Sequence, residues 1–233
     1  MASNIKQVVI LSGGKGTRMR ELTESLPKPM VDIGGMPVLD HLINIFSEFN
    51  QFEFLICGGY KYELIEDHFK TVSNVSVINT GLETNTGGRL YKIRELLDKN
   101  FIVTYGDGLA NVNINSLINF HFQHNNTGTV TVTNPTSRFG LVDFDSDFLI
   151  KKFIEKPKLD GFINMGFMVF KSKIMDFLHD NSVLESEPLM KLTEVDQLRA
   201  FVHDGYFEPM DTYREYLNLN KLWDTGEKPW TKF

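Results

Sequence analysis

The sequence is poor in cysteine, and it has no long apolar run. Cys57 is its only cysteine, which excludes an internal disulfide and a cysteine-based metal cluster. Three apolar residues, 54–56, directly precede Cys57, so we expect its side chain to fill space in a core. No apolar segment approaches the ~20 residues that span a bilayer. The N-terminus also reaches its first expected strand without the apolar stretch of a signal peptide. These absences predict a cytoplasmic protein.

Basic residues are also fewer than acidic ones. The chain has 24 Lys and Arg against 30 Asp and Glu, which gives a formal net charge of −6 at pH 7. Proteins that coat nucleic acid carry a positive excess, so the composition argues against that class. Any phosphate site must then come from a local arrangement of groups. The 233 residues, 42% of them hydrophobic and 23% charged, suffice for one large folded domain with a substantial core.

Short apolar runs alternate with amphipathic stretches along most of the chain. This order predicts an α/β fold with a Rossmann-like, mostly parallel sheet flanked by helices, and ligands at the carboxyl ends of its strands. The expected strands are Val8–Leu11, Phe54–Cys57, Val75–Ile78, Phe101–Tyr105, Thr127–Val132 and Phe167–Phe170, and the expected helices are Val38–Phe49, Tyr62–Phe69, Arg89–Leu97, Ile114–His124, Lys173–Leu178 and Leu189–Ala200. From about residue 127, short strands and turns suggest an irregular or antiparallel part that closes over the crevice. We therefore expect one domain, 1–233, with lobes at about 1–126 and 127–233.

The most informative segment is the glycine-rich stretch after the first expected strand. Residues 12–18 read Ser-Gly-Gly-Lys-Gly-Thr-Arg, and glycines after a strand form a backbone nest that binds phosphate. Arg18 and Lys28 could add two mobile cations, one a bidentate fork and the other a point charge. The dinucleotide fingerprint fails at Met19, where it needs a third glycine, and no P-loop string occurs. A plain glycine turn is the alternative, but the nearby basic residues favour a nucleoside triphosphate site.

Two aspartates could hold Mg²⁺ at this crevice. Asp107 lies between Gly106 and Gly108, directly after an expected strand. A carboxylate there is a hard oxygen ligand suited to Mg²⁺, whereas an Asp-Gly turn is the alternative. Beside a phosphate site, the metal interpretation of Asp107 is favoured. Asp211 precedes Thr212 and a helix-like stretch, so a helix N-cap and a second metal ligand are equally open.

Two further polar segments allow either a binding role or an ordinary structural one. Glu155-Lys156-Pro157 follows an alternating run, and its proline stops a strand. The ammonium there could hold a phosphate and the carboxylate could accept sugar hydroxyls, but a surface ion pair is the simpler explanation. Residues 86–89, Thr-Gly-Gly-Arg, open an expected helix. They could form an anion site, a platform for a flat base, or only a helix-start turn.

Together these segments resemble the sugar-1-phosphate nucleotidylyltransferases, and most closely their cytidylyl branch, the glucose-1-phosphate cytidylyltransferases. The resemblance extends over nearly the whole chain. Its motifs lie at 13–18, 28–31, 34–37, 57–61, 86–90, 104–108, 138–140, 155–158, 187–190, 209–212 and 222–230. The N-terminal signature is that of the superfamily. The strings Thr-Gly-Gly-Arg-Leu, Tyr-Gly-Asp-Gly and Pro-Met-Asp-Thr point to the cytidylyl branch.

This resemblance implies an enzyme that transfers a cytidylyl group from CTP to a sugar 1-phosphate by in-line attack assisted by Mg²⁺, with glucose 1-phosphate as the expected acceptor. It implies a nucleotide-binding first lobe, a sugar-phosphate-binding second lobe, and a homo-oligomer with no nucleic-acid or membrane partner. Arg18 and Lys28 would be catalytic, and Asp107 and Asp211 would hold the metal. The nucleotide would be bound by Leu11, Gly13, Gly14, Lys15, Gly16, Thr17, Arg18, Lys28, Thr86, Gly87 and Gly88, and the sugar phosphate by Gly140, Glu155, Lys156 and Asn164.

Two departures from the family pattern bear on these expectations. Met165 follows Asn164 where the pattern has a glycine, and its side chain could narrow the pocket or change the acceptor. The segment between Phe69 and Thr86 is shorter than in the cytidylyl branch, where it helps to cover the nucleotide and to build subunit contacts. One alternative is the same chemistry with another nucleoside triphosphate or acceptor. A non-catalytic nucleotide-sugar binder is the other, and it predicts lost cations or carboxylates, whereas this chain retains them.

Overall fold

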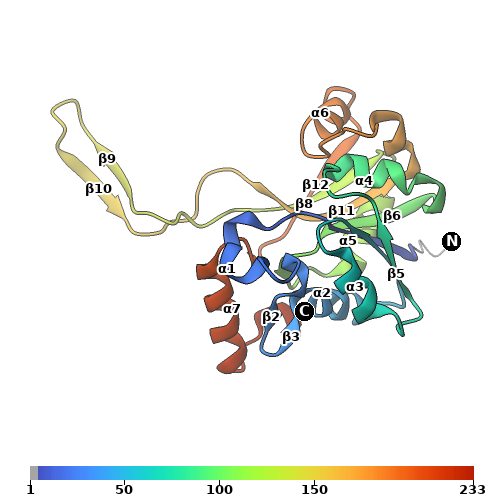
Figure 1. The fold of residues 1–233 in the computed structure, drawn as a ribbon. Coiled ribbons are helices and arrows are strands. Elements are labelled where there is room, and N and C mark those ends of the chain that lie inside the picture. The colour runs from blue at the N-terminus through green and yellow to red at the C-terminus, as the bar shows by residue number, and fades with distance from the viewer. Residues whose placement is uncertain (1–4) are drawn as a thin grey trace.

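A seven-stranded sheet forms the centre of the computed structural model, which describes residues 5–233 (Figure 1). In order across the sheet the strands are β12 (Leu198–Val202), β8 (Gly128–Thr133), β11 (Ile163–Lys171), β6 (Asn100–Tyr105), β1 (Gln7–Ser12), β4 (Glu53–Gly58) and β5 (Val75–Asn79). β1 runs parallel to β4 and β6, β5 to β4, and β12 to β8. β11 runs antiparallel to both of its neighbours. The predicted mostly parallel sheet is confirmed.

Helices cover both faces of this sheet. The helices of the described residues are α1 (Arg20–Thr23), α2 (Val38–Ser47), α3 (Tyr62–Phe69), α4 (Thr86–Lys92), α5 (Ile114–Gln123), α6 (Glu187–Glu194) and α7 (Tyr213–Asp224), with 3₁₀ turns at Thr17–Met19, Lys28–Met30, Arg94–Leu96, Ser172–Phe177 and Pro229–Thr231. Because side chains alternate along a strand, Val8 and Ile10 of β1 pack in one core cluster with α2, α3 and α5. Val9 and Leu11 pack in a second cluster with α4 and α6. Burial on both faces explains the unbroken apolar run of this strand.

A third apolar cluster joins the N-terminal part of the chain to its C-terminal end. It includes Met19, Ile33, Leu109, Leu219 of α7, and Trp230. Two small antiparallel pairs flank it, namely β2 (Asp32–Ile33) with β3 (Met36–Pro37), and β7 (Gly108–Ala110) with β13 (Phe207–Pro209). The segments that follow β1 and β6 are therefore packed against residues from the end of the chain.

Each predicted strand is present, but one predicted helix is wrong in its second half. The sequence predicts a helix at Leu189–Ala200, whereas α6 ends at Glu194 and β12 follows it. Asp196 has a left-handed backbone with φ of 56°, and the Gln197 amide donates to the Leu192 carbonyl at 2.7 Å. This closure ends the helix and turns the chain into a strand that pairs with β8.

Cys57 occupies the core position that the sequence predicts. It is buried in the same cluster as Val9, and burial raises the pKa of its thiol to about 12. The predicted lobe boundary near residue 126 falls between α5 and β8, and strands from both sides of it share the one sheet. In residues 5–233, no helix is long and apolar enough to cross a bilayer.

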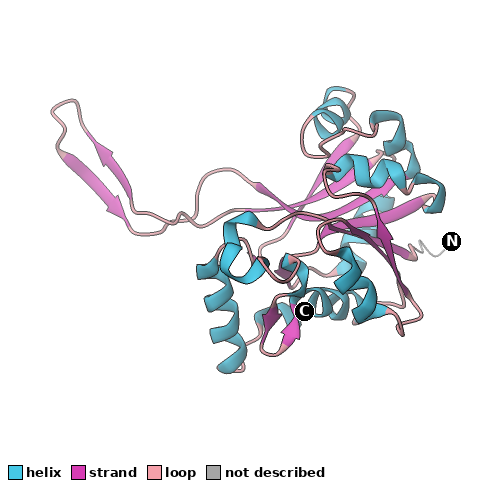
Figure 2. Ribbon diagram, in the orientation of Figure 1, coloured by secondary structure: helices cyan, strands magenta, loops and turns pink. Residues whose placement is uncertain are grey.

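A two-stranded hairpin projects from the body of the molecule (Figures 1 and 2). Its strands, β9 (Leu141–Phe144) and β10 (Ile150–Ile154), pair with each other and lie outside the central sheet. The segments that lead into it are joined where the Asn134 side-chain amide donates to the Gly161 carbonyl at 2.7 Å. We call residues 134–161 the arm. The arm points away from the body, and none of its residues is buried. The prediction that this antiparallel part closes over the crevice is therefore wrong for the single chain, since no core contact holds the arm there.

Candidate active site

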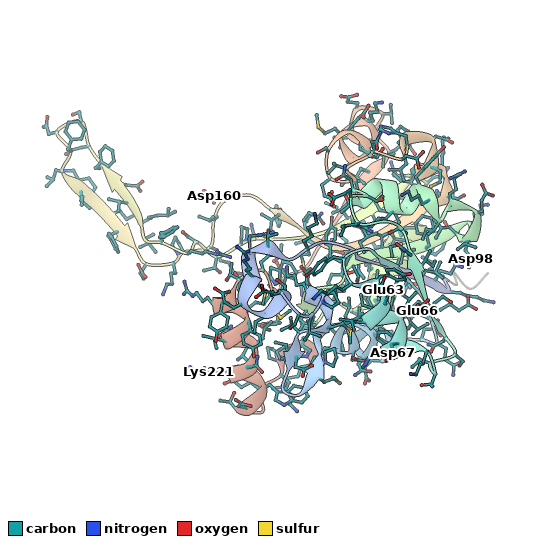
Figure 3. The ribbon with its side chains drawn as sticks, in the orientation of Figure 1. Glu63, Glu66, Asp67, Asp98, Asp160 and Lys221 are labelled. Atoms are coloured by element: carbon teal, nitrogen blue, oxygen red, sulfur yellow. The ribbon has the colours of Figure 1, made fainter. Side chains whose placement is uncertain are left out.

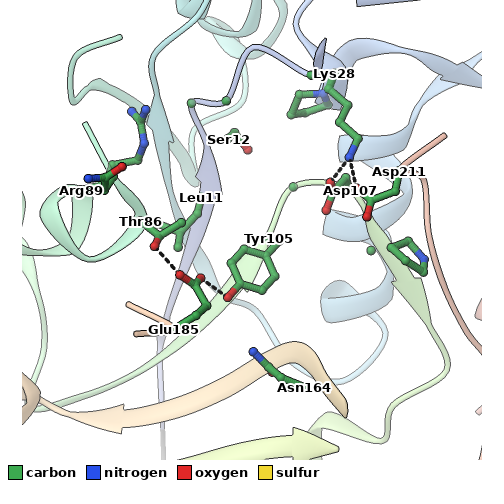
Figure 4. A pocket seen from close by; sticks show the side chains of 18 of the residues that line it. Leu11, Ser12, Lys28, Thr86, Arg89, Tyr105, Asp107, Asn164, Glu185 and Asp211 are labelled. Atoms are coloured by element: carbon green, nitrogen blue, oxygen red, sulfur yellow. Dashed lines mark hydrogen bonds and ion pairs between the residues drawn. The ribbon is translucent and has the colours of Figure 1, made fainter. Parts of the chain in front are cut away.

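A cavity of about 690 Å³ opens at the carboxyl ends of β1 and β6, where the fold predicts a ligand site. Its wall combines the loop after β1, the turn after β6, the start of α4 and the start of β11 (Figure 4). Of the predicted site residues, it brings together Leu11, Gly13, Gly14, Gly16, Thr17, Arg18, Lys28, Thr86, Asp107, Asn164 and Asp211.

The glycine loop after β1 lays backbone against this cavity. Gly13, Gly14 and Gly16 all line it. Gly16 has a left-handed φ of 61°, which glycine adopts without strain, and the Thr23 hydroxyl donates to the Gly16 carbonyl at 2.9 Å. These features hold the loop in a fixed conformation. At the three glycines no side chain covers the backbone, so a ligand can reach it, as an anion-binding nest requires.

A buried arginine braces the back of this loop. Arg89 is 4% exposed, and its Nη1 donates to the carbonyls of Gly58 and Gly81 at 2.8 and 2.9 Å and to Thr80 Oγ1 at 2.6 Å. These contacts join the segments after β4 and β5. A side chain at Gly13 would overlap the Arg89 guanidinium. The loop can therefore pack against Arg89 because residue 13 is glycine.

At one end of the cavity, the Lys28 ammonium lies between two carboxylates (Figure 4). Lys28 Nζ is 2.7 Å from Asp211 Oδ1 and also forms an ion pair with Asp107. Arg18 Nη1 lies 3.0 Å from Asp211 Oδ2. Burial disfavours a charged ammonium, but the pairs with Asp107 and Asp211 outweigh burial and raise the pKa of Lys28. Burial also disfavours a carboxylate, but the pairs with Lys28 and Arg18 outweigh it and lower the pKa of Asp211. Lys28 and Asp211 are therefore both charged at neutral pH.

Backbone pairing brings the two aspartates together from distant parts of the sequence. β7 and β13 are antiparallel, with Gly108 opposite Pro209. Beyond this pair, the Met210 amide donates to the Asp107 carbonyl at 2.9 Å. Asp107 and Asp211 therefore lie at adjacent ends of one small ladder, from which both side chains reach Lys28.

The helix-cap explanation of Asp211 is wrong. Thr212 is the N-cap of α7, and a capping box pairs its side chain and backbone with Glu215. The Asp211 carboxylate is thus left to face the cavity. At Asp107 the turn interpretation is confirmed, because residues 106 and 107 form a turn. The Asp107 carboxylate pairs with Lys28, and its role as a metal ligand stays a prediction.

The two aspartates share one cation in this structure, the Lys28 ammonium, and Asp211 also pairs with Arg18. Within the described residues, no group of three or more His, Cys, Asp and Glu side chains could enclose a metal ion. A pair of carboxylates nevertheless fits Mg²⁺, which keeps several waters and takes further ligands from substrate phosphates. Asp107 and Asp211 fit the metal role that the sequence predicts, and that role stays a prediction.

Glu185, which the sequence analysis does not single out, lies at the other end of the cavity. Its carboxylate accepts hydrogen bonds from the Tyr105 hydroxyl and from Thr86 Oγ1, the latter at 2.7 Å (Figure 4). Burial, and after it the Glu185 carboxylate, raises the pKa of Tyr105 above its ordinary value, so the phenol remains a donor. Glu185 lies in an irregular segment, 99 residues along the chain from Thr86, and no local motif marks it.

The chain matches known proteins over almost its whole length. The family model for nucleotidyl transferases matches residues 7–217. The chain belongs to the nucleotidyl transferase family. The glucose-1-phosphate cytidylyltransferase of Salmonella typhi is 39% identical over 253 residues and covers 96% of this chain and 98% of that protein. A probable glucose-1-phosphate cytidylyltransferase of Bacillus subtilis is 36% identical over 251 residues, with the same two coverages. The crystal structure of HddC from Yersinia pseudotuberculosis superposes with a TM-score of 0.70 at 25% identity, over 94% of this chain and 100% of that one.

Three predicted nucleotide-binding residues of this nucleotidyl transferase do not line the cavity. Lys15 Nζ lies 2.7 Å from Glu83 Oε1, and both side chains are exposed. Gly87 and Gly88 pack against Ser182 instead. A side chain at Gly87 would lie 2.8 Å from Ser182 Cβ, and the Gly88 amide donates to the Ser182 carbonyl at 2.9 Å. The two glycines thus allow α4 to approach a neighbouring segment closely.

Three of the four predicted sugar-phosphate residues lie on the arm. Gly140, Glu155 and Lys156 do not line the cavity. Lys156 Nζ is 3.6 Å from Glu155 Oε1 with both side chains exposed, which matches a surface ion pair in the single chain. Asn164, at the start of β11, does line the cavity, and the buried Met165 beside it forms part of the same wall. Contact between the arm residues and a sugar phosphate stays a prediction.

Proposed function

We propose that this nucleotidyl transferase moves a cytidylyl group from CTP to glucose 1-phosphate and releases pyrophosphate. The observation that carries the proposal is the pairing of Lys28 with Asp107 and Asp211 in the cavity that the glycine loop lines. The relatives support the choice of base and acceptor, since the Salmonella typhi protein of 39% identity is named for both. The cytoplasmic location predicted from the sequence is part of the same proposal.

The reaction joins two polyanions, so the cationic end of the cavity is the natural place for it. An oxygen of the acceptor phosphate forms a bond to the α-phosphorus of CTP, while the bond from that phosphorus to the pyrophosphate oxygen breaks. No side chain is needed as a nucleophile. Arg18 and Lys28 would offset the charge of the triphosphate, and the glycine loop would let it approach the backbone closely. Mg²⁺, held by Asp107 and Asp211, would supply further positive charge to the reacting phosphates.

The test is a panel of four nucleoside triphosphates, each combined with several sugar 1-phosphates and Mg²⁺, with pyrophosphate release as the readout. The proposal expects release from CTP with glucose 1-phosphate to exceed that from every other pair by at least ~10-fold. Faster release with another nucleotide or sugar would reassign the specificity within the same reaction class. Release from no pair at all would indicate a nucleotide-sugar binder and would overturn the proposal.

The arm supports a second part of the proposal, that the chain forms a homo-oligomer. Phe139 and Phe148 are 77% and 80% exposed, and Phe153 is also exposed. Large exposed apolar patches mark contact surfaces, and a two-stranded hairpin alone in water is marginal. Glu155 and Lys156 lie on the same arm. An arm laid over the cavity of a second copy would cover the apolar side chains and bring this pair to the sugar phosphate.

A further inference from the structure

The cavity has two chemically different ends (Figure 4). Lys28 with Asp107 and Asp211 occupies one of them. At the other end, Glu185 carries a carboxylate that forms no ion pair with Lys, Arg or His anywhere in the part of the chain that the structure describes. Because an unpaired carboxylate repels phosphate oxygens, the phosphates of both substrates belong at the Lys28 end. The Glu185 end is left for an uncharged part of a substrate.

Glu185 is held in a fixed orientation by its two hydroxyl partners. The Tyr105 hydroxyl donates to Oε1 and the Thr86 hydroxyl to Oε2, the latter at 2.7 Å. Thr86 is itself oriented, because its Oγ1 accepts from the Leu184 amide at 2.9 Å and its single proton then goes to Glu185. A carboxylate has about four acceptor positions, so lone pairs remain for a ligand in the cavity that Glu185 lines.

Asn164 adds the complementary donor on the same side of the cavity. The Gly166 amide donates to Asn164 Oδ1 at 2.8 Å, which leaves the amide nitrogen directed toward Tyr105 and the cavity (Figure 4). A carboxylate that accepts and an amide that donates match a ring of neighbouring hydroxyls, because each hydroxyl both donates and accepts.

We propose that Glu185 is a specificity-determining residue that accepts hydrogen bonds from the ring hydroxyls of the acceptor sugar. This inference rests on the proposed function and names a contact within it. Glu185 selects a polyol ring that lies against Tyr105 and Asn164 in the cavity, and it disfavours acceptors that lack the contacted hydroxyl. An acceptor that lacks this hydroxyl leaves the oriented carboxylate without that hydrogen bond.

The experiment compares the wild type with Glu185→Ala and Glu185→Gln, using CTP with glucose 1-phosphate and with analogues that each lack one ring hydroxyl. Glu185→Ala should raise the KM for glucose 1-phosphate about 10- to 100-fold, the usual range for a hydrogen bond to a charged group. It should change the KM for CTP by less than ~3-fold. The wild type should use one of these analogues poorly. Glu185→Ala should use that analogue and glucose 1-phosphate with equal kcat/KM. Glu185→Gln keeps the size of the side chain and one acceptor oxygen, so its KM for glucose 1-phosphate should lie between those of the wild type and Glu185→Ala.

Three results would overturn the inference and leave the proposed function in place. An increase in the KM for CTP alone, or a relaxed preference for CTP over UTP, would mean that the carboxylate contacts the cytosine amino group. Unchanged KM values for both substrates would mean that it contacts neither. Glu187→Ala is the matched control, because Glu187 is exposed, pairs with Lys191 and does not line the cavity. A wild type that releases no pyrophosphate from any pair would remove the proposed function and this inference with it, whereas an active wild type with an unaffected Glu185 variant removes the inference alone.

Discussion

The cavity and the arm hold their side chains in different ways. At the cavity, the β7–β13 ladder places Asp107 and Asp211 on either side of the Lys28 ammonium. In the arm, β9 and β10 pair only with each other among the described strands, and Figure 3 shows their side chains standing clear of the body. The charged groups of the cavity already have partners within one chain. The apolar side chains of the arm contact one another, as where Phe144 stacks on Phe148, and they stay exposed until another surface covers them.

This difference separates two contributions to the same reaction. Electrostatic stabilisation of a transition state depends on groups that are in place before the substrate arrives, and the cavity provides them. An element without a core contributes only when it docks, so under the proposed function the effect of the arm would fall on acceptor binding and on assembly. We therefore expect cavity substitutions to lower turnover, and arm substitutions to weaken acceptor binding or self-association.

The largest expected effect is the loss of Asp107. Asp107→Ala removes one of the two carboxylates that pair with Lys28 and that fit Mg²⁺, so turnover should fall ~100-fold or more. Pyrophosphate release at saturating CTP, glucose 1-phosphate and Mg²⁺ measures this. Asp67→Ala is the matched control, because Asp67 pairs with Lys70 on the exposed surface of α3 and should be dispensable. Near-normal turnover of Asp107→Ala would count against this end of the cavity as the reaction centre.

The next largest effect tests whether the arm contributes to acceptor binding, and whether it does so at the cavity of its own chain or of a second copy. Lys156→Ala should raise the KM for glucose 1-phosphate about 10-fold through the loss of one charged contact, with little change for CTP. The arm could serve the cavity of its own chain or the cavity of a second copy. Co-expression of Lys156→Ala with Asp107→Ala then distinguishes these two geometries. If the arm serves a second copy, mixed assemblies contain one intact cavity with one intact arm, and about a quarter of the wild-type rate returns in a randomly mixed dimer. The rate is measured below the KM for the acceptor.

The outcome of that mixing experiment is decisive in either direction. An oligomeric sample whose rate on mixing does not rise above the residual rate of Lys156→Ala would mean that each arm folds back to its own cavity. A Lys156→Ala variant with an unchanged KM for the acceptor would remove Lys156 from the site altogether and leave it the surface ion pair with Glu155.

The same difference explains how far the sequence could predict this molecule. The glycine loop and Asp107 directly follow strands that are buried on both faces. Their common edge follows from the parallel order of the strands alone. These local signals were sufficient for the sheet and for one end of the cavity.

Other parts depend on contacts between distant segments, which local patterns do not encode. Asp211 reads equally well as a helix cap until β13 pairs with β7 and Thr212 takes the cap. Glu185 reaches Thr86 across 99 residues of sequence. The alternation in residues 150–154 predicts a strand correctly, yet nothing in it says what the strand packs against. The direction of the arm could therefore not be predicted.

A smaller effect concerns assembly. Phe139→Asn with Phe148→Asn removes the two most exposed aromatic side chains of the arm and suits the left-handed backbone of residue 148, where φ is 61°. We expect the oligomer to dissociate at micromolar concentration, as measured by light scattering after size exclusion. The free energy of unfolding of the body should change by less than ~0.5 kcal/mol. Leu96→Asn, exposed on the body, should leave the assembly intact. An unchanged oligomer in the double variant would exclude the arm as its contact.

The smallest expected effect separates the cavity from the arm by pH. Pairing lowers the pKa of Asp211, so its stabilising contribution is present above the ordinary aspartate pKa of ~3.9 and is lost as pH falls through the lower folded value. Pairing raises the pKa of Lys28, so that contribution is present below ~10.4 and is lost as pH rises through the higher folded value. Between about pH 5 and 9, Asp211→Asn should therefore lower the free energy of unfolding by a constant amount, about 1–2 kcal/mol.

Urea denaturation at pH 3, 5, 7 and 9 measures this difference, which should shrink only at pH 3. Asp145→Asn is the arm counterpart of Asp211→Asn. A hydrogen bond from Lys151 lowers the pKa of Asp145, but the pair lies in solvent on an element that contributes nothing to the core. Unfolding of the body should therefore not register its loss at any pH. A slope through neutral pH for Asp211→Asn would mean that the pairs with Lys28 and Arg18 do not keep Asp211 charged there. A measurable cost for Asp145→Asn would mean that the arm contributes to the stability of the body, and the distinction drawn between arm and cavity would have to be abandoned.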